Sequence, residues 1–295
     1  MKLNFKDITI QDKQIYDKYL PLYKDFYGWE YSFAMTWIWN AFDQTQICDT
    51  GDMAFVRTKF YGKRVYFPPF LKDHAQLPKA LEIIESECKQ ENVEFDLRGL
   101  LQCQIDLLDK NKYSFKTSDC TKDYIYNTQD LITLVGKRFH SKRNFVNRFK
   151  LTYPDFKFLT YDEKRDRKNI FDLFFKWQSS TEHETLALEE KIISSALDAY
   201  SALDLKIGVL YVGDQLAAFT VMDASNPYIA QTFFEKADKD FVGSYQAINQ
   251  FAATKFLKDV LLVNRQEDLG IEGLKKAKES YYPVHLVEKF KVKLK

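Results

Sequence analysis

The sequence predicts two consecutive α/β (α+β) domains, each with a mixed central sheet flanked by helices. Length is the first observation, because a chain of 295 residues is long enough for two ordinary domains. The second is a repeated order of elements: strand, helix, three-stranded meander, helix, strand, helix, strand. The third is composition, since 45% hydrophobic and 29% charged residues are typical of a globular protein. Together they favour two similar folded halves.

An amphipathic helix opens the recognisable part of each half. In the first half, apolar residues recur with the spacing of one helical face. These residues are Ala34, Trp37, Ile38, Ala41 and Phe42. The second half repeats the pattern with Ile193, Ala196, Leu197 and Tyr200. We therefore expect matching helices at equivalent positions.

A meander follows each helix. Gly51-Asp52 and Gly213-Asp214 each separate two strand-like runs, which is the pattern of a hairpin. A third aromatic run follows at 64–73 and at 228–238. The remaining helices and strands are expected at 76–89, 95–99, 100–109 and 124–126 in the first copy, and at 244–258, 262–265, 271–280 and 285–292 in the second. The break near 129–136 gives a degenerate N-terminal domain over 1–135 and a C-terminal domain over 136–295.

Composition argues against several functional classes. The formal net charge is +1, so no overall field attracts nucleic acid or membrane, and any polyanion site must be local. The four cysteines have no CxxC spacing and the four histidines are scattered, so we expect no metal site and no disulfide framework. No apolar stretch approaches the roughly 18 residues that span a bilayer, and residues 1–7 do not resemble a signal peptide. We expect a cytoplasmic protein without stable membrane insertion, and no oligomeric state is predicted.

Three stretches of the second half carry a family resemblance. Residues 136–144 read GKRFHSKRN, 234–238 and 243–249 read FEKAD and GSYQAIN, and 264–278 read NRQEDLGIEGLKKAK. They resemble the motifs GKKFHKKRN, EKAD…GAYQxIN and NREEDLGIEGLRKAK of the phosphatidylglycerol lysyltransferase C-terminal-like family. The third motif is the most specific because it is long and ungapped. Lys275 departs from the arginine expected there, which matters only if a planar bidentate contact is required.

This resemblance implies two tandem GNAT-like domains, since the family is similar to tandem GNAT-fold acyltransferases and aminoacyltransferases. Such enzymes build peptidoglycan cross-bridges or aminoacylate lipids. The lipid-modifying members carry a membrane-spanning flippase region before this domain, and that region is absent here, so lipid specificity is not expected to carry over. The resemblance implies no permanently bound cofactor, and either acyl-CoA or aminoacyl-tRNA as co-substrate.

Donor phosphates are expected at two places. Residues 137–150 carry six Lys or Arg on a predicted helix, which would bind donor phosphates or a tRNA backbone, or else form a solvated face between the domains. GNAT domains bind donor pyrophosphate at a helix N-terminus, and Gly243 lies at such a place, with an ordinary N-cap as the alternative. The expected donor-binding residues are Lys137, Lys142, Arg143, Asn144, Gly243 and Ser244.

The acceptor is expected beside the third strand of the second meander. Glu235 ends that strand, where GNAT folds bring acceptor and donor together, and it would take a proton from an attacking ammonium. Its alternative role is an ion pair with Lys236. A polar group follows the next strand, at a strand end where open α/β sheets bind ligands. Its members are Asn264, Arg265, Glu267 and Asp268.

We therefore expect Glu235 and Asp268 as candidate bases, with Arg265 orienting a carboxylate or phosphate of the acceptor. Asn264 and Glu267 would bind the acceptor in the same open cleft. Tyr245 and Asn249, four residues apart on the intervening helix, would line it too, although core packing also explains Tyr245.

The expected function is acyl or aminoacyl transfer from acyl-CoA or aminoacyl-tRNA to an amine or hydroxyl of a small-molecule acceptor, with tRNA as a candidate partner. Catalysis would depend on positioning and on electrostatic support of a tetrahedral intermediate, because no nucleophile–His–acid triad is evident. The alternative is a non-catalytic module with a GNAT-like fold that binds CoA, nucleotide or tRNA.

Overall fold

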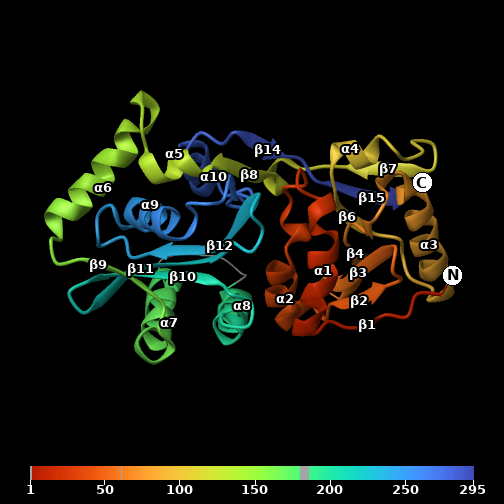
Figure 1. Cartoon of the computed structure of the whole chain (residues 1–295), viewed down its shortest axis with the longest axis horizontal. Coiled ribbons are helices and arrows are strands. Elements are labelled where there is room, and N and C mark those ends of the chain that lie inside the picture. Colours follow the sequence, from red (N-terminus) through yellow and green to blue (C-terminus); the bar gives the residue numbers. More distant parts are fainter. Residues whose placement is uncertain (1, 61, 180–185) are drawn as a thin grey trace. The chain divides into compact units, whose positions relative to one another are not determined.

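The computed structural model describes residues 2–60, 62–179 and 186–295, and the chain divides into two compact units (Figure 1). The first unit consists of Met1–Asp123, Glu267–Leu274 and Leu286–Lys295. The second unit consists of Tyr124–Gln266 and Lys275–His285. The division thus differs from the single predicted boundary after residue 135, because two C-terminal segments belong to the first unit.

The first unit contains a mixed sheet in the order β1-β2-β3-β4-β6-β15-β7, with β5 paired to β3. Its strands are β1 (Lys6–Asp7), β2 (Gln46–Asp49), β3 (Met53–Phe60), β4 (Lys63–Tyr66), β5 (Phe70–Leu71), β6 (Leu97–Leu100), β7 (Tyr113–Lys116) and β15 (Phe290–Leu294). Its helices are α1 (Lys13–Tyr19), α2 (Phe33–Asp43), α3 (Leu77–Gln90) and α4 (Gln102–Ile105). The helix expected over 100–109 is therefore only one turn long.

The second unit contains a sheet in the order β14-β8-β13-β12-β11-β10-β9. Its strands are β8 (Asp123–Asn127), β9 (Lys157–Thr160), β10 (Lys206–Val212), β11 (Gln215–Asp223), β12 (Ile229–Ala237), β13 (Leu262–Asn264) and β14 (His285–Val287). Its helices are α5 (Thr128–Thr133), α6 (His140–Thr152), α7 (Glu163–Ser179), α8 (Leu186–Ala199), α9 (Ser244–Phe256) and α10 (Glu272–Glu279). Each sheet is an antiparallel meander followed by one parallel pair, β4 with β6 and β12 with β13, so the predicted class is confirmed.

The last strands of the two halves are exchanged relative to the sequence prediction. Residues 124–126 were expected to end the first sheet, but β8 pairs with β13 in the second. The strand expected over 285–292 in the second sheet divides: β14 lies in that sheet, but β15 lies between β6 and β7 in the first. Burial explains the exchange, since Tyr126 packs in the second core while Val292 is fully buried in the first.

Helix α9 covers one face of the second sheet, with α7 and α8 on the other (Figure 1). Small residues on α9, Ala252 and Ala253, let its backbone approach the sheet closely, and they pack with Met222 of β11 and Val263 of β13. This packing establishes which strand residues face α9, and those residues define the site described below.

In the part of the chain that the structure describes, no helix is both long enough and apolar enough to cross a membrane.

Candidate functional site

The parallel pair β12–β13 is short, and its end opens an edge in the second sheet. Pairing stops at Gln231 with Asn264, but β12 continues to Ala237. Over 232–237, β12 therefore has a strand partner on one side only, β11, among the residues described. Gln266 Nε2 donates to the Thr232 carbonyl at 3.0 Å, just past the last strand pair. The backbone of β12 beyond Thr232 therefore has no strand partner on the side of β13 among the described residues.

Glu235, Asn249 and Arg265 form one bonded group at this edge. Arg265 Nη2 donates to Glu235 Oε1 at 2.7 Å, and Asn249 Nδ2 donates to Glu235 Oε2 at 3.0 Å. The Arg265 and Glu235 side chains are only 13% and 11% exposed. A buried arginine needs such a partner, because an unpaired charge in this environment is costly. The group joins three of the residues expected to form the site.

Two tyrosine rings enclose the Arg265 guanidinium. Its carbon lies 5.6 Å from the centroid of Tyr126 and 5.0 Å from that of Tyr281, which allows cation–π attraction. Burial raises the pKa of both phenols above the usual range, so both rings are neutral at ordinary pH. Lys142 of α6 places its Nζ 4.5 Å from the centroid of the Tyr281 ring. Two cations thus accompany the single carboxylate of Glu235, and the site favours an anion.

Burial is the larger cause that lowers the pKa of the Lys142 ammonium, and repulsion from the Arg265 guanidinium is the smaller one. An anion bound near both groups would relieve that repulsion.

Three buried polar atoms near the pair have no hydrogen-bond partner among the described residues. They are Arg265 Nη1, Asn249 Oδ1 and Thr232 Oγ1. Thr232 is in register with Met222, which packs under α9, so Thr232 faces α9 as Glu235 does. Buried polar groups are normally satisfied. These atoms, one donor, one acceptor and one hydroxyl, are suited to a ligand with both polar characters.

The other predicted acceptor residues lie elsewhere. Asn264 is fully buried, and its Oδ1 accepts from Gln266 N at 2.6 Å, so it shapes the turn that carries Arg265. Tyr245 accepts a hydrogen bond from Trp177 Nε1 at 3.1 Å. Glu267 and Asp268 belong to the first unit. There Asp268 Oδ1 accepts from Gly270 N at 2.8 Å, which caps the turn before α10.

Of the predicted donor-binding residues, only Lys142 is linked to Arg265. Arg143 Nη1 donates to the carbonyls of Leu134 and Gly136, the latter at 2.7 Å, so it fixes the loop before α6. Asn144 Nδ2 lies 3.0 Å from His140 Nε2. Lys137 is exposed on the 3-10 turn before α6.

The N-terminus of α9 is closely packed. A Cβ at Gly243 would lie 2.4 Å from the Phe145 carbonyl oxygen of α6, and its φ of +90° also favours glycine. Ser244 Oγ donates to the Asp238 carbonyl at 3.0 Å, and Ser244 N donates to the Phe241 carbonyl at 3.0 Å. Close packing against α6 explains Gly243 without a ligand.

Sequence reasoning did not select Thr232, Tyr126, Tyr281 or Lys278. Tyr281 directly follows the helix expected over 271–280, and Thr232 is one polar residue in an aromatic strand. The signal that could have identified Lys278 was its place as the last residue of the third family motif.

The fold and this site define a class: the protein has a tandem GNAT-like acyltransferase fold, with a charged group at the open strand edge of its second unit. A tandem GNAT protein from the clavulanic acid biosynthesis pathway, solved without AcCoA, superposes with a TM-score of 0.51 at 9% identity, covering 99% of this chain and 98% of that one. The chain belongs to the family described as phosphatidylglycerol lysyltransferase, C-terminal, which it matches over residues 23–293.

Three individual relatives are similar to this chain over most of its length. A conserved protein of unknown function from Bacteroides thetaiotaomicron superposes with a TM-score of 0.93 at 29% identity over 100% of both chains. The L-PGS structure from Bacillus licheniformis gives a TM-score of 0.65 at 14% identity, over 94% of this chain and 91% of that one. An uncharacterized protein of Mycoplasmoides gallisepticum is 25% identical over 239 residues, 79% of this chain and 76% of that protein.

Proposed function

We propose that the second unit transfers an aminoacyl group from aminoacyl-tRNA to a hydroxyl or amine of an acceptor that carries an anionic group. The observation that carries this proposal is the Arg265–Glu235 pair beside the open edge of β12, with Arg265 Nη1 not used by the described residues. A fixed guanidinium nitrogen at a partly buried edge is suited to hold either an anion or a developing oxyanion.

The reaction requires few groups from the protein. The acceptor oxygen or nitrogen attacks the ester carbonyl carbon, the ester C–O bond breaks, and the acceptor proton ends on the tRNA hydroxyl. Arg265 Nη1 would donate to the carbonyl oxygen as negative charge develops there. Each Glu235 oxygen accepts one of the bonds described above and keeps a second lone pair, so Glu235 can take the acceptor proton.

Two uncommitted oxygens support an aminoacyl donor over a simple acyl donor. Asn249 Oδ1 accepts hydrogen bonds, as does Thr232 Oγ1, and both are buried on the α9 face beside Glu235. An α-ammonium group supplies donors for such oxygens, whereas an acetyl group does not. The family description names lysyl transfer, which agrees with this preference.

The competing function is a non-catalytic module that binds CoA, nucleotide or tRNA. It is favoured by the cations Arg265 and Lys142, which bind a phosphate equally well without any transfer. The two functions differ in whether the ester is consumed.

The deciding experiment incubates the purified chain with lysyl-tRNA labelled in the lysine and, separately, with labelled acetyl-CoA. Phosphatidylglycerol vesicles and glycerol phosphate serve as trial acceptors. We expect label from lysyl-tRNA to move to an acceptor, and a folded Arg265→Met/Glu235→Gln variant to lose at least about 100-fold of the rate. Binding of lysyl-tRNA without loss of the ester would support the non-catalytic module, and transfer from acetyl-CoA alone would refute the aminoacyl donor.

A further inference from the structure

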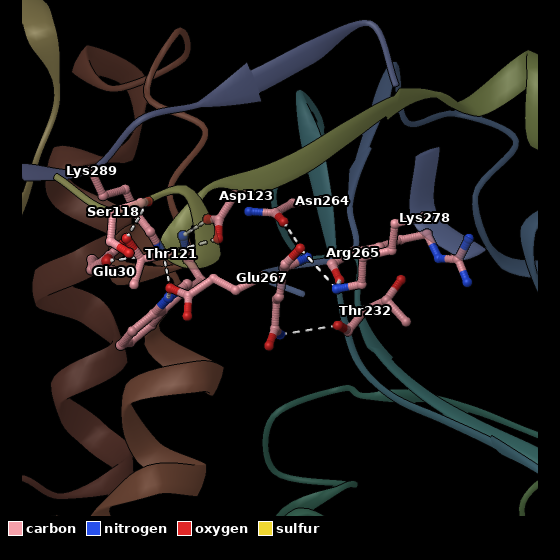
Figure 2. A network of polar contacts seen from close by, with 12 residues as sticks. Glu30, Ser118, Thr121, Asp123, Thr232, Asn264, Arg265, Glu267, Lys278 and Lys289 are labelled. Atoms are coloured by element: carbon pink, nitrogen blue, oxygen red, sulfur yellow. Dashed lines mark hydrogen bonds and ion pairs between the residues drawn. The ribbon is translucent and has the colours of Figure 1, made fainter. Parts of the chain in front are cut away.

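The motif at 264–278 closes on itself in space. Its last residue, Lys278 of α10, donates from Nζ to the carbonyl of Arg265 at 2.7 Å and to that of Gln266 at 2.9 Å. Lys278 is only 6% exposed, which is uncommon for lysine. Figure 2 shows its side chain directed at the turn that carries Arg265. The first residues of the motif and its last residue are therefore in direct contact.

The turn lies beyond the end of β13 at Asn264, and β8 holds one side of it: Arg265 N donates to the Tyr124 carbonyl at 3.0 Å, and Tyr124 N donates to the Gln266 carbonyl at 3.3 Å. Gln266 adopts a left-handed φ of +59°, a conformation that costs energy in a residue other than glycine. Asn264 Oδ1 holds the Gln266 amide at 2.6 Å, and Lys278 holds the two carbonyls. The backbone of Arg265 is thus fixed through both of its neighbours.

Tyr126 links the turn to the guanidinium. Its hydroxyl donates to the Lys278 carbonyl at 2.9 Å, while its ring lies 5.6 Å from the guanidinium carbon of Arg265. Displacing Lys278 would therefore remove its bonds to the carbonyls of Arg265 and Gln266 and loosen the ring that contacts the Arg265 side chain, while the Arg265 amide would still donate to the Tyr124 carbonyl at 3.0 Å. Contacts that share partners in this way are expected to act cooperatively.

We propose that Lys278 is a positioning residue for Arg265: its ammonium fixes the turn so that the guanidinium faces Glu235 and presents Nη1 to the ligand. This inference rests on the proposed function for its catalytic consequence. Its structural part, the orientation of Arg265, can be tested without any transfer reaction.

The test compares Lys278→Met, which keeps the length of the side chain but removes its donors, with Lys278→Arg, which restores donors and charge. Lys275→Met is the matched control, because Lys275 is exposed on the same helix. The first readout is phenylglyoxal labelling followed by peptide mass spectrometry. The Arg265 side chain is only 13% exposed and should react slowly in the native protein, and Arg143, partly buried in the same unit and bonded to the Gly136 carbonyl, reports on general unfolding of that unit.

We expect Lys278→Met to raise the labelling rate of Arg265 by at least about tenfold while the labelling rate of Arg143 stays unchanged, and Lys278→Arg to restore most of the protection. The second readout is transfer from lysyl-tRNA. We expect Lys278→Met to lower kcat/KM by about 10- to 100-fold, and to cause little further loss when Arg265 is already methionine.

Unchanged Arg265 labelling in a folded Lys278→Met variant would overturn the positioning role. If that variant does not fold, Tyr126→Phe removes the bond to the Lys278 carbonyl and should raise Arg265 labelling in the same direction. Failure of the proposed function gives a different pattern: the labelling changes as expected, but no variant affects transfer because none occurs.

Discussion

Lys289 Nζ lies 2.9 Å from Asp123 Oδ1, across 166 positions of sequence, and both side chains are buried in the first unit. The same ammonium lies 3.4 Å from Glu30 Oε1 and 2.5 Å from Glu267 Oε1 (Figure 2). Asp123 ends the first segment of this unit, Glu267 begins the second, and Lys289 lies near the start of the third. One lysine therefore joins all three segments.

The Lys289 group makes the stability of the first unit depend on pH. Burial raises the pKa of Glu30 to about 8, Lys289 offsets part of that rise, and Asp123 adds to it. Burial opposes the charged form of Lys289, but Asp123, Glu30 and Glu267 outweigh it and hold its pKa above the usual range. Near neutral pH, Glu30 thus keeps a proton that the unfolded chain has released.

The sign follows from proton binding. Between the ordinary glutamate value of about 4.5 and the folded value of about 8, the native state binds more protons than the unfolded state, so stability falls as pH rises. We expect the free energy of unfolding to decrease from about pH 4.5 to about pH 8, and Glu30→Gln to remove most of this slope. Denaturant titrations at several pH values measure it, with the exposed Glu82→Gln as control. Equal slopes in all three proteins would contradict the assignment.

Most elements could be predicted from the sequence, but their assignment to sheets could not. Periodicity identified α2 and α8, since helical spacing is a local property, and the repeated order of elements located α3, α9 and α10 within a few residues. The residues of β8 and β15 predict a short strand in each case. Which sheet each strand joins depends on contacts distant in sequence, such as Val292 with the first core.

The same limit applies to the site. Glu235, Arg265 and Asn249 were predictable because they lie at a strand end and on the adjoining helix. Residue type alone could not show that Arg143 and Asp268 bind the backbone and not a ligand. The sequence does not reveal which backbone carbonyls and amides they bond to. Tyr126 contacts Arg265 because β8 pairs with β13 in the second sheet, which the sequence did not predict.

The assignment of β15 to the first sheet can be tested at Val292. Truncation to alanine should destabilise the first unit by about 2 kcal/mol, because a fully buried side chain is lost from its core. Hydrogen exchange should accelerate in β6 and β7, the neighbours of β15. Val284→Ala, at a side chain 42% exposed, is the control and should have little effect. Faster exchange in β12 and β13 in place of β6 and β7 would assign the C-terminal strand to the second sheet.

Lys142 and Arg143 are adjacent in sequence, but their substitution should affect different properties: ligand binding for Lys142 and stability for Arg143. Arg143→Ala removes the donor for the Leu134 and Gly136 carbonyls and should lower stability by about 1 to 3 kcal/mol. Lys142→Ala should leave stability nearly unchanged, weaken tRNA binding and reduce its salt dependence, because it removes a cation beside Arg265. Thermal melts and filter binding at several salt concentrations measure both effects. If Arg143→Ala alone changed the salt dependence, Arg143 would be the donor-binding residue.

Three variants distinguish the contribution of the Arg265–Glu235 pair to stability from its contribution to transfer. Arg265→Met leaves Glu235 buried without its cation and should cost about 3 kcal/mol of stability. Glu235→Gln keeps the shape of the side chain and leaves Arg265 as an unbalanced charge, with a similar cost. The double variant removes both charges, so we expect it to be more stable than the sum of the single losses predicts, with a coupling energy of about 1 to 3 kcal/mol.

Transfer should be lost in all three variants, whereas stability recovers only in the double variant. Denaturant unfolding together with the lysyl-tRNA assay measures the two quantities on the same samples. Additive stabilities would show that the pair is not coupled in solution, and a double variant that regained transfer along with stability would show that the pair supports the fold and not the reaction.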